Sequence, residues 1–371
     1  MSDIPLLDTE VETSLRRVMR DLLSTRCDAS TVARAYEGDR TLTRTLWTSI
    51  VDDLGLAGLL IPEDRGGAGG TARDAAVVLE ELGRFVAPVP FLTSSVIAAT
   101  VLLAGDSALV GQLGDGSRSA ALLTPFSTAL ATRVPALTAD ADGRVSGRVT
   151  SVTSVAGALD ADVLLAAVET ADGTEVHALT AAAAAIEPVV SLDMTRPLAD
   201  VVVDSVPSRV VVAAEFGSGA IQSGLTIGAA LLASEQAGVA AWCLETTVEY
   251  LKLRRQFGRV VGGFQALKHR LADLYVEVES ASAAARYAAG TFAADDPDSV
   301  IAAAVAASYC SDVAVRAAEE AVQLHGGIGM TWEHPAHLYL KRAKADQIGL
   351  GSPGHHRRLL ADLVGLPSEA A

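Results

Sequence analysis

Long apolar segments with few helix-breaking residues between residues 213 and 325 constrain the fold most strongly. One runs from about Leu225 to Lys252 without a proline. A second follows Phe264 and repeats its apolar residues at helical spacing, and a third extends from about Asp298 to His325. Segments of this length and period predict helices that pack side by side. With the shorter basic helix beyond them, they predict a four-helix bundle.

The stretch from Gln323 to Arg358 contains the clearest stop signals. Gly326 and Gly327 follow directly after the third helix. Glycine adopts the left-handed conformation at little cost, so these residues predict a helix C-cap with exposed backbone. A basic helix and a second glycine-rich loop, residues 349–354, come next.

Residues 1–118 predict a helical domain and residues 119–212 a small β domain. Thr71 with Asp74 is a capping-box pattern that predicts a helix start after a glycine-rich loop. In the second region β-branched runs alternate with Asp-Gly turns at 142–143 and 172–173, which indicates hairpins. With a bundle domain over residues 213–371, the expected fold class is α+β, mainly α.

Composition excludes several classes of function. The net charge of -16 disfavours nucleic-acid binding. The three cysteines form no CxxC pair and no metal-ligand spacing occurs, so we expect no metal site and a reducing, cytoplasmic compartment. Residues 221–243 are apolar but contain Glu235 and other polar groups, which favours a buried bundle helix over a membrane span.

Arg254, Arg255 and Arg259 cluster in this acidic chain beside several glycines. The planar guanidinium fork of arginine matches phosphate oxygens, so the cluster is a candidate phosphate site. The alternative is a solvated helix end, where basic groups offset the helix dipole. On charge alone, the solvated helix end is the favoured interpretation.

The motifs together resemble the acyl-CoA dehydrogenase family of flavoproteins over nearly the whole chain. RRQFG followed by FQ is similar to the family's C-terminal signature, QLHGG to its Q-x-x-G-G, and LGLAGLLIPEDRGGAGG with VLEELGR to its N-terminal domain. In the family such groups hold the ADP half of FAD bound mainly by a neighbouring subunit. The resemblance therefore implies cofactor-binding roles for Arg254, Gln256, Phe257, Gln265, Gln323, Gly326 and Gly327.

The family's chemistry removes a proton from an acyl-CoA thioester while a hydride leaves for the flavin, and a carboxylate takes the proton. Alignment with the family's Y-E-G-T motif places Leu350 at the usual base position and Ser352 where a hydroxyl reaches the cofactor. A second family position for the base falls at Gly228. The nearest acids are Glu235 and Asp346, so no catalytic residue is expected unless one of these has taken over.

The flavin-ring contacts also depart from the family pattern. Ser154 and Ala156 fall at the Trp and Thr of the family's W-I-T-N, and the T-E-P element is reduced to LLTPFSTAL. The ADP contacts are thus present, whereas the ring contacts and the base are missing.

This asymmetry resembles the non-catalytic subunit of actinobacterial α2β2 acyl-CoA dehydrogenases that act on steroid side chains. The resemblance implies FAD, a catalytic sister subunit, an acyl-CoA at or near the interface, and an electron acceptor. Two alternatives stay open. One is a homo-oligomeric dehydrogenase that uses Glu235 or Asp346 as its base, and the other is a flavin-free structural or binding protein of the same fold.

Overall fold

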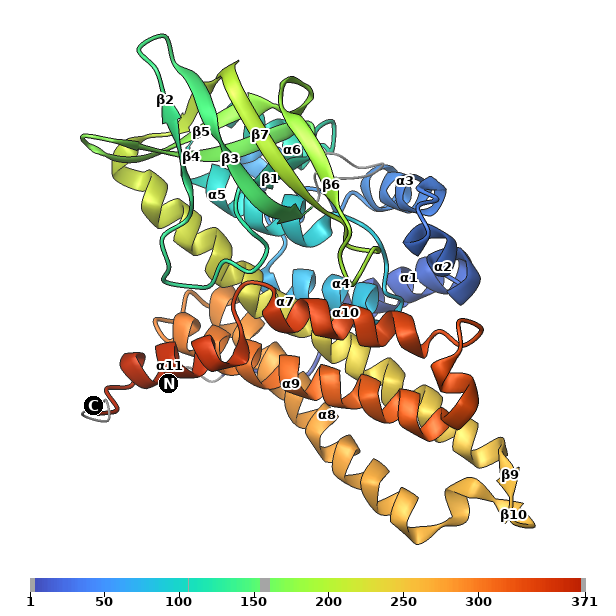
Figure 1. Cartoon of the computed structure of the whole chain (residues 1–371). Helices are drawn as coiled ribbons and strands as arrows, with labels where there is room; N and C mark the ends of the chain where they lie inside the picture. Colours follow the sequence, from blue (N-terminus) through green and yellow to red (C-terminus); the bar gives the residue numbers. More distant parts are fainter. Residues whose placement is uncertain (1–3, 106, 154–160, 368–371) are drawn as a thin grey trace.

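The computed structural model describes residues 4–105, 107–153 and 161–367. Helices, then a sheet, then a helical bundle follow one another along the chain, which is the predicted α+β order (Figure 1). The exact domain limits remain a prediction. Ser154 and Ala156 lie outside the described residues.

The N-terminal helices begin at caps that the sequence supplies. Thr9 and Thr71 each accept a backbone hydrogen bond from the third helical residue, whose carboxylate bonds back to the cap. The Thr71–Asp74 capping box is therefore confirmed. Two π-helical segments, residues 49–53 and 91–98, adjoin α3 and α5. These helices are α1 (Glu10–Arg26), α2 (Ala29–Tyr36), α3 (Thr41–Thr48), α4 (Ala72–Arg84), α5 (Ala99–Leu103) and α6 (Ser107–Gly114).

The central sheet has eight strands in the order β6-β7-β3-β2-β4-β5-β8, with β1 also paired to β4. Both predicted Asp-Gly turns join neighbouring antiparallel strands, and Gly143 and Gly173 have positive φ. The strands form an apolar core of their own, which includes Leu164 and Val201. The strands are β1 (Ala120–Leu122), β2 (Ala136–Ala139), β3 (Arg144–Thr153), β4 (Val163–Thr170), β5 (Gly173–Thr180), β6 (Ala185–Val189), β7 (Leu198–Pro207) and β8 (Arg209–Val212).

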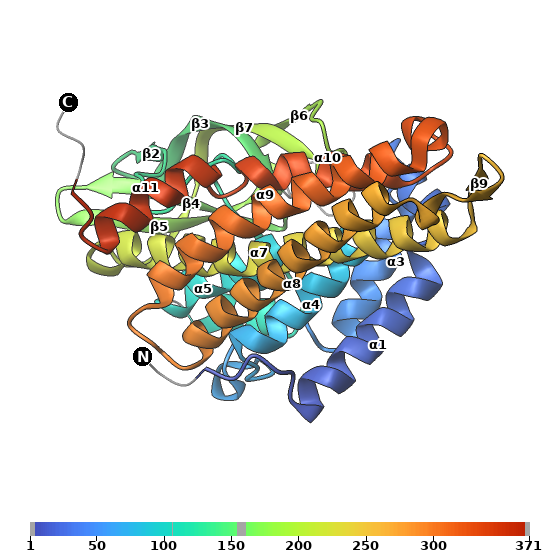
Figure 2. The ribbon, with the colours of Figure 1, turned by 90° about the horizontal axis from the view of Figure 1, so that it is seen from below.

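Long helices make up the C-terminal bundle, and a two-stranded hairpin connects the first two of them. In the underside view α1, α4, α7 and α8 lie side by side (Figure 2). The elements are α7 (Ala214–Leu253), β9 (Arg255–Gln256), β10 (Arg259–Val260), α8 (Gln265–Ala293), α9 (Ser299–His325), α10 (Ala336–Ile348) and α11 (Pro353–Leu363).

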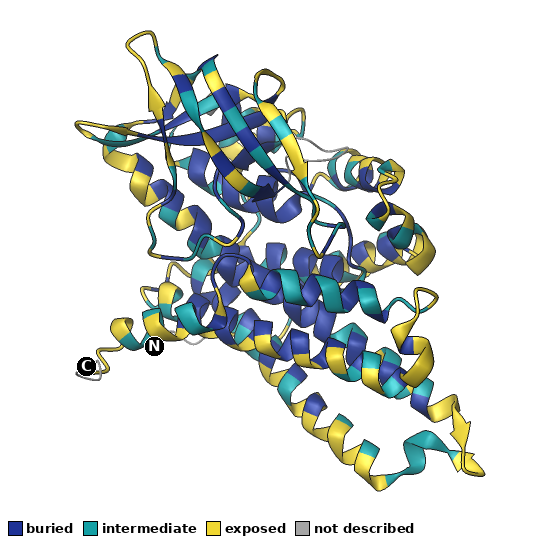
Figure 3. Cartoon of the chain, in the orientation of Figure 1, coloured by how far each residue is buried: buried dark blue, intermediate teal, exposed yellow. Residues whose placement is uncertain are grey.

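Helix α7 is the central element of the molecule. It contacts α4, α8, α9 and β5, and much of it is buried (Figure 3). Two helical stretches, Ala214–Leu253 and Ser299–Met330, are long and apolar enough to cross a membrane, but most of an apolar 18-residue window in each is buried within the protein. This burial agrees with the prediction of a core helix. Helix α7 starts about 11 residues earlier than its predicted start at Leu225.

The early start of α7 has a packing explanation. Gly217 and Gly224 lower helix propensity in this first part, which is why the sequence pattern favours a later start. In the structure a Cβ on Gly217 would lie 1.9 Å from the Thr174 carbonyl oxygen, and one on Gly224 would lie 2.8 Å from Val101. These glycines allow the helix to lie directly against the sheet and α5.

Helices α4 and α7 cross through reciprocal glycine contacts. A Cβ on Gly83 would lie 2.1 Å from the Glu235 carbonyl oxygen, and one on Gly238 would lie 1.9 Å from that of Glu80. The two backbones therefore touch directly, and a larger residue at either position forces the helices apart.

We predict that Gly238→Ala lowers stability by roughly 1–3 kcal/mol, because the added methyl overlaps the α4 backbone. Gly219→Ala, on an exposed part of the same helix with open space around it, is expected to raise stability by about 0.5–1 kcal/mol. Thermal unfolding of the two variants measures both effects. A Tm shift of the same sign for both would contradict the proposed contact.

Candidate functional site

A buried ionic network lies where α7, α10 and the loop between β6 and β7 meet. Its centre is Arg342 on α10, whose side chain is only 1% exposed. Its Nε donates to Asp193 at 2.5 Å, its Nη1 to Glu235 at 2.5 Å, and its Nη2 to Thr195 Oγ1 at 2.7 Å. The guanidinium is therefore held by partners from two other segments of the chain.

A second guanidinium extends the network. Arg196 donates to both carboxylate oxygens of Glu235 at 2.7 Å and to Asp346 Oδ1 at 2.6 Å. Two arginines thus face three carboxylates: Glu235 from α7, Asp346 from α10, and Asp193. Glu235 accepts hydrogen bonds from both Arg196 and Arg342 and so links the two guanidiniums.

The three carboxyl groups of the network differ in acidity. Burial opposes ionisation of Glu235 and Asp193, but neighbouring arginines outweigh it and lower the pKa of both. For Asp346, burial and the negative charges of Glu235 and Asp193 raise the pKa to about 8, although both arginines oppose this. Its Oδ2 is buried and has no hydrogen-bond partner in the described part of the chain. Glu235 is therefore a weak proton acceptor, and Asp346 is the group that can hold a proton near neutrality.

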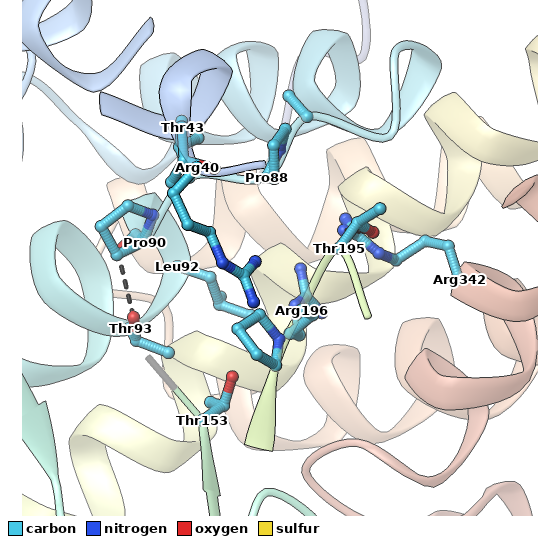
Figure 4. A pocket seen from close by; sticks show the side chains of 13 residues that line it. Arg40, Thr43, Pro88, Pro90, Leu92, Thr93, Thr153, Thr195, Arg196 and Arg342 are labelled. Carbon is cyan, nitrogen blue, oxygen red and sulfur yellow. Dashed lines mark hydrogen bonds between the residues drawn. The ribbon is translucent and has the colours of Figure 1, made fainter. Parts of the chain in front are cut away.

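A cavity of about 40 Å³ adjoins the network (Figure 4). Its polar lining comes from both arginines of the network, from Arg40 at the start of α3, and from threonine hydroxyls. The lining residues are Arg40, Thr43, Ala87, Pro88, Val89, Pro90, Leu92, Thr93, Thr153, Thr195, Arg196, Pro197 and Arg342.

Leu350 is buried next to Gly228 and Phe126. It is 2% exposed, has φ 54°, and its N–H donates to the Phe126 carbonyl at 2.7 Å. Its side chain packs against Gly228, where an added Cβ would lie 3.2 Å from Leu350 Cδ1. The Phe126 ring occupies the direction in which a side chain at Gly349 would project, 2.6 Å from its Cβ position.

A second cavity, of about 20 Å³, lies between Leu350, Phe126 and Leu225, and shares Thr93 and Thr153 with the first. Ligand pockets for molecules of cofactor size usually measure about 300–1,000 Å³. The described residues around Leu350 therefore do not fit a flavin ring. Asp346 is not among the residues that line either cavity.

The residues predicted to hold ADP gather at one end of the bundle. Arg254 ends α7, and Gln256 and Phe257 belong to the β9–β10 hairpin, whose turn has φ 52° at Phe257 and 74° at Gly258. Gln265 begins α8. All four residues are exposed.

The end of α9 reaches the same region. The rings of Tyr250 on α7 and His325 on α9 stack with centroids 4.5 Å apart. Gly326 caps α9 with φ 65°, as predicted, and Gln323 and Gly327 are exposed beside it. We call this group of Arg254, Gln256, Phe257, Gln265, Gln323, Gly326 and Gly327 the bundle-end cluster.

Large exposed apolar side chains belong to the bundle-end cluster or lie close to it in sequence. Phe257 is 88% exposed, Leu253 80%, Met330 79% and Trp332 67%. A group of exposed apolar side chains of this kind marks an interaction surface in soluble proteins. Ser352 lies apart from it, as the N-cap of α11, where its Oγ accepts from the His355 N–H at 3.3 Å.

Sequence reasoning missed the arginines at the centre of the network. Arg342 belongs to the basic helix that is predicted between the two glycine-rich segments, and Asp346 is predicted only as an acid near the position of the base. Both are buried in the network, whereas Lys344 is partly exposed and pairs with Glu319. The available signal was the LDMTRP segment, where Asp193 and Arg196 directly precede a strand.

Comparison with known proteins agrees with the fold and the motifs. Residues 9–110 match the model for the acyl-CoA dehydrogenase N-terminal domain, and residues 216–365 match that for the C-terminal domain. Acyl-CoA dehydrogenase IpdE2 of Mycolicibacterium smegmatis is 35% identical over 354 residues, which cover 94% of this chain and 97% of that protein.

Two solved heteromeric structures are also similar. The ChsE4–ChsE5 complex from Mycobacterium tuberculosis has a chain with a TM-score of 0.85 and 25% identity, covering 98% of this chain and 100% of its own. The Tcur3481–Tcur3483 steroid acyl-CoA dehydrogenase variant gives 0.82 and 29%, covering 96% and 98%. This chain belongs to the acyl-CoA dehydrogenase family.

Proposed function

We propose that the chain is a subunit of an FAD-dependent acyl-CoA dehydrogenase that desaturates an acyl-CoA thioester, with a steroid side chain as the candidate acyl group. It supplies the bundle-end cluster to the ADP half of FAD, and a sister subunit holds the flavin ring and the catalytic base. The reduced complex passes its electrons to a separate acceptor. The compartment is the cytoplasm, where the three buried, unpaired cysteines stay reduced.

The observation that carries this proposal is the contrast between two regions. The bundle-end cluster is exposed and accessible to a ligand, whereas the cavity that Leu350 lines measures only about 20 Å³ and the neighbouring cavity about 40 Å³. A homo-oligomer would have little use for an ADP clamp without a ring site, but a hetero-oligomer would. The two-chain structures among the similar proteins support this interpretation.

The bundle-end cluster fits the ADP half of FAD in its chemistry. The guanidinium of Arg254 is exposed and makes no hydrogen bond or salt bridge with the described residues, and a planar fork binds phosphate oxygens in bidentate fashion. Added Cβ atoms at Gly326 and Gly327 would meet nothing within 4 Å, so their backbone is accessible to a ligand. When bound, FAD supplies the hydride acceptor, which no amino-acid side chain provides.

One observation favours a second function. Asp346 has a raised pKa and a carboxylate oxygen with no hydrogen-bond partner among the described residues, which favours a homo-oligomeric dehydrogenase with a relocated base. Asp346 lines neither cavity, so this function requires a rearrangement that opens a path to its carboxylate. Glu235 is less suitable, since both of its oxygens are occupied by arginines. Under this function the purified chain itself turns over an acyl-CoA, and Asp346→Asn abolishes that turnover.

We expect the chain purified alone to carry little FAD, whereas the complex co-expressed with its sister subunit is yellow. The reason is the close packing around Leu350. Visible absorption per polypeptide measures the flavin content. A stoichiometrically flavinylated, active homo-oligomer would overturn the heteromeric function, and a stable complex without flavin would favour a binding or structural protein.

Arg254→Ala is expected to weaken FAD binding by the assembled complex about 10- to 100-fold, because a charge-assisted contact to the pyrophosphate is lost. The exposed side chain contributes little to folding, so Tm should stay unchanged. Flavin fluorescence titration measures the affinity. Arg358→Ala removes an exposed arginine on α11, away from the hairpin, and serves as the control. Equal affinity of both variants would contradict the role of Arg254.

The network predicts a pH-dependent stability. Because the folded pKa of Asp346 is raised, its contribution is complete below the unfolded value near 4 and is lost as pH rises towards about 8. Asn does not titrate and keeps an acceptor for Arg196, so the Tm of Asp346→Asn relative to wild type should rise between pH 6 and pH 9.

Asp28→Asn is the matched control for this series. Asp28 is an exposed N-cap, and hydrogen bonds from Ser30 and Thr31 lower its pKa to about 2, so it stays ionised throughout the range. Its Tm difference from wild type should not depend on pH between 6 and 9. A constant difference for Asp346→Asn as well would show that Asp346 is ionised at neutral pH.

A further inference from the structure

The cavity beside the network is lined by a cation that no described carboxylate neutralises. Arg196 and Arg342 lie in its wall, but their guanidiniums are already bound by Glu235, Asp346 and Asp193. Arg40 is different. It is half-buried at the start of α3, its guanidinium points into the cavity, and it makes no salt bridge within the described ranges (Figure 4).

Two hydroxyl groups in the cavity wall also have no hydrogen-bond partner within residues 4–105, 107–153 and 161–367. Thr43 and Thr153 are each 7% exposed, and their Oγ1 atoms have no hydrogen-bond partner among the residues described. A buried hydroxyl without a partner is unfavourable, so such groups usually face a ligand or an ordered water. They come from α3 and from the end of β3, on different sides of the cavity from each other.

The size and the remaining walls restrict the ligand. A volume of about 40 Å³ holds about three water molecules. Pro88, Pro90, Leu92 and Pro197 give apolar walls, which strengthen an electrostatic contact inside. One unpaired guanidinium, two hydroxyl donors and room for about three heavy atoms match a planar carboxylate.

We propose that this cavity binds a carboxylate group, which accepts hydrogen bonds from the Arg40 guanidinium and from the hydroxyls of Thr43 and Thr153. The carboxylate belongs either to a free small acid or to the far end of a larger ligand. The site lies in this chain alone and does not depend on the division of labour between subunits.

Titration of the full-length chain with sodium acetate, at an ionic strength held constant with sodium chloride, tests the site. Acetate should raise Tm in a saturable manner, because it binds only the folded state. Arg40→Gln should weaken its apparent affinity about 10- to 100-fold, and Thr153→Val about 3- to 10-fold. Arg44→Gln, an exposed arginine of the same helix outside the cavity, should leave it unchanged.

Two thioesters distinguish the sources of the carboxylate. If the chain binds glutaryl-CoA more tightly than butyryl-CoA, and if this difference in affinity requires Arg40 and is reduced by acetate, the site binds the far end of a larger ligand. Acetate binding without that preference assigns it to a free acid. The site is refuted if acetate gives no saturable rise in Tm. It is also refuted if Arg40→Gln and Thr153→Val are folded by circular dichroism and bind acetate with the same affinity as Arg44→Gln.

Discussion

The arrangement of the molecule depends on the pairing of the buried Arg342 and the partly buried Arg196 with three carboxylates. Removing charges from water is costly, and attraction between them offsets that cost only when nearly every donor and acceptor is matched. Arg342 and Arg196 meet this condition through contacts to α7, α10 and the β6–β7 loop. The position of α10, and of Leu350 just after it, relative to the sheet is therefore set by charge matching as well as by apolar packing.

The sequence predicted those parts of the fold that depend on local chemistry. The Thr71–Asp74 capping box and the Asp-Gly turns of two hairpins act over a few residues, so their pattern was sufficient. The first part of α7 was missed, because Gly217 and Gly224 disfavour a helix locally. Their advantage appears only when the sheet and α5 lie against them, which no local pattern reveals.

The same distinction holds for the candidate site. The bundle-end cluster could be predicted because its residues form short motifs near helix ends. Arg342 could not, since its partners Asp193 and Glu235 are 149 and 107 residues away in sequence. A charged residue in a basic helix is ordinarily solvated, and only distant partners make its burial possible. Arg40 was missed for a related reason: its cavity is formed by five separate segments.

The exposed apolar side chains in and beside the bundle-end cluster also affect whether free chains associate with one another in solution. Phe257, Leu253 and Met330 are each at least 79% exposed, and such surfaces attract one another in water. The net charge of -16 supplies the opposing repulsion between molecules. Repulsion disappears near the isoelectric point of about 4.8, and added salt shortens its range. Acidification or high salt therefore favours clustering of free chains through this end of the bundle, and a subunit that covers the end removes the tendency.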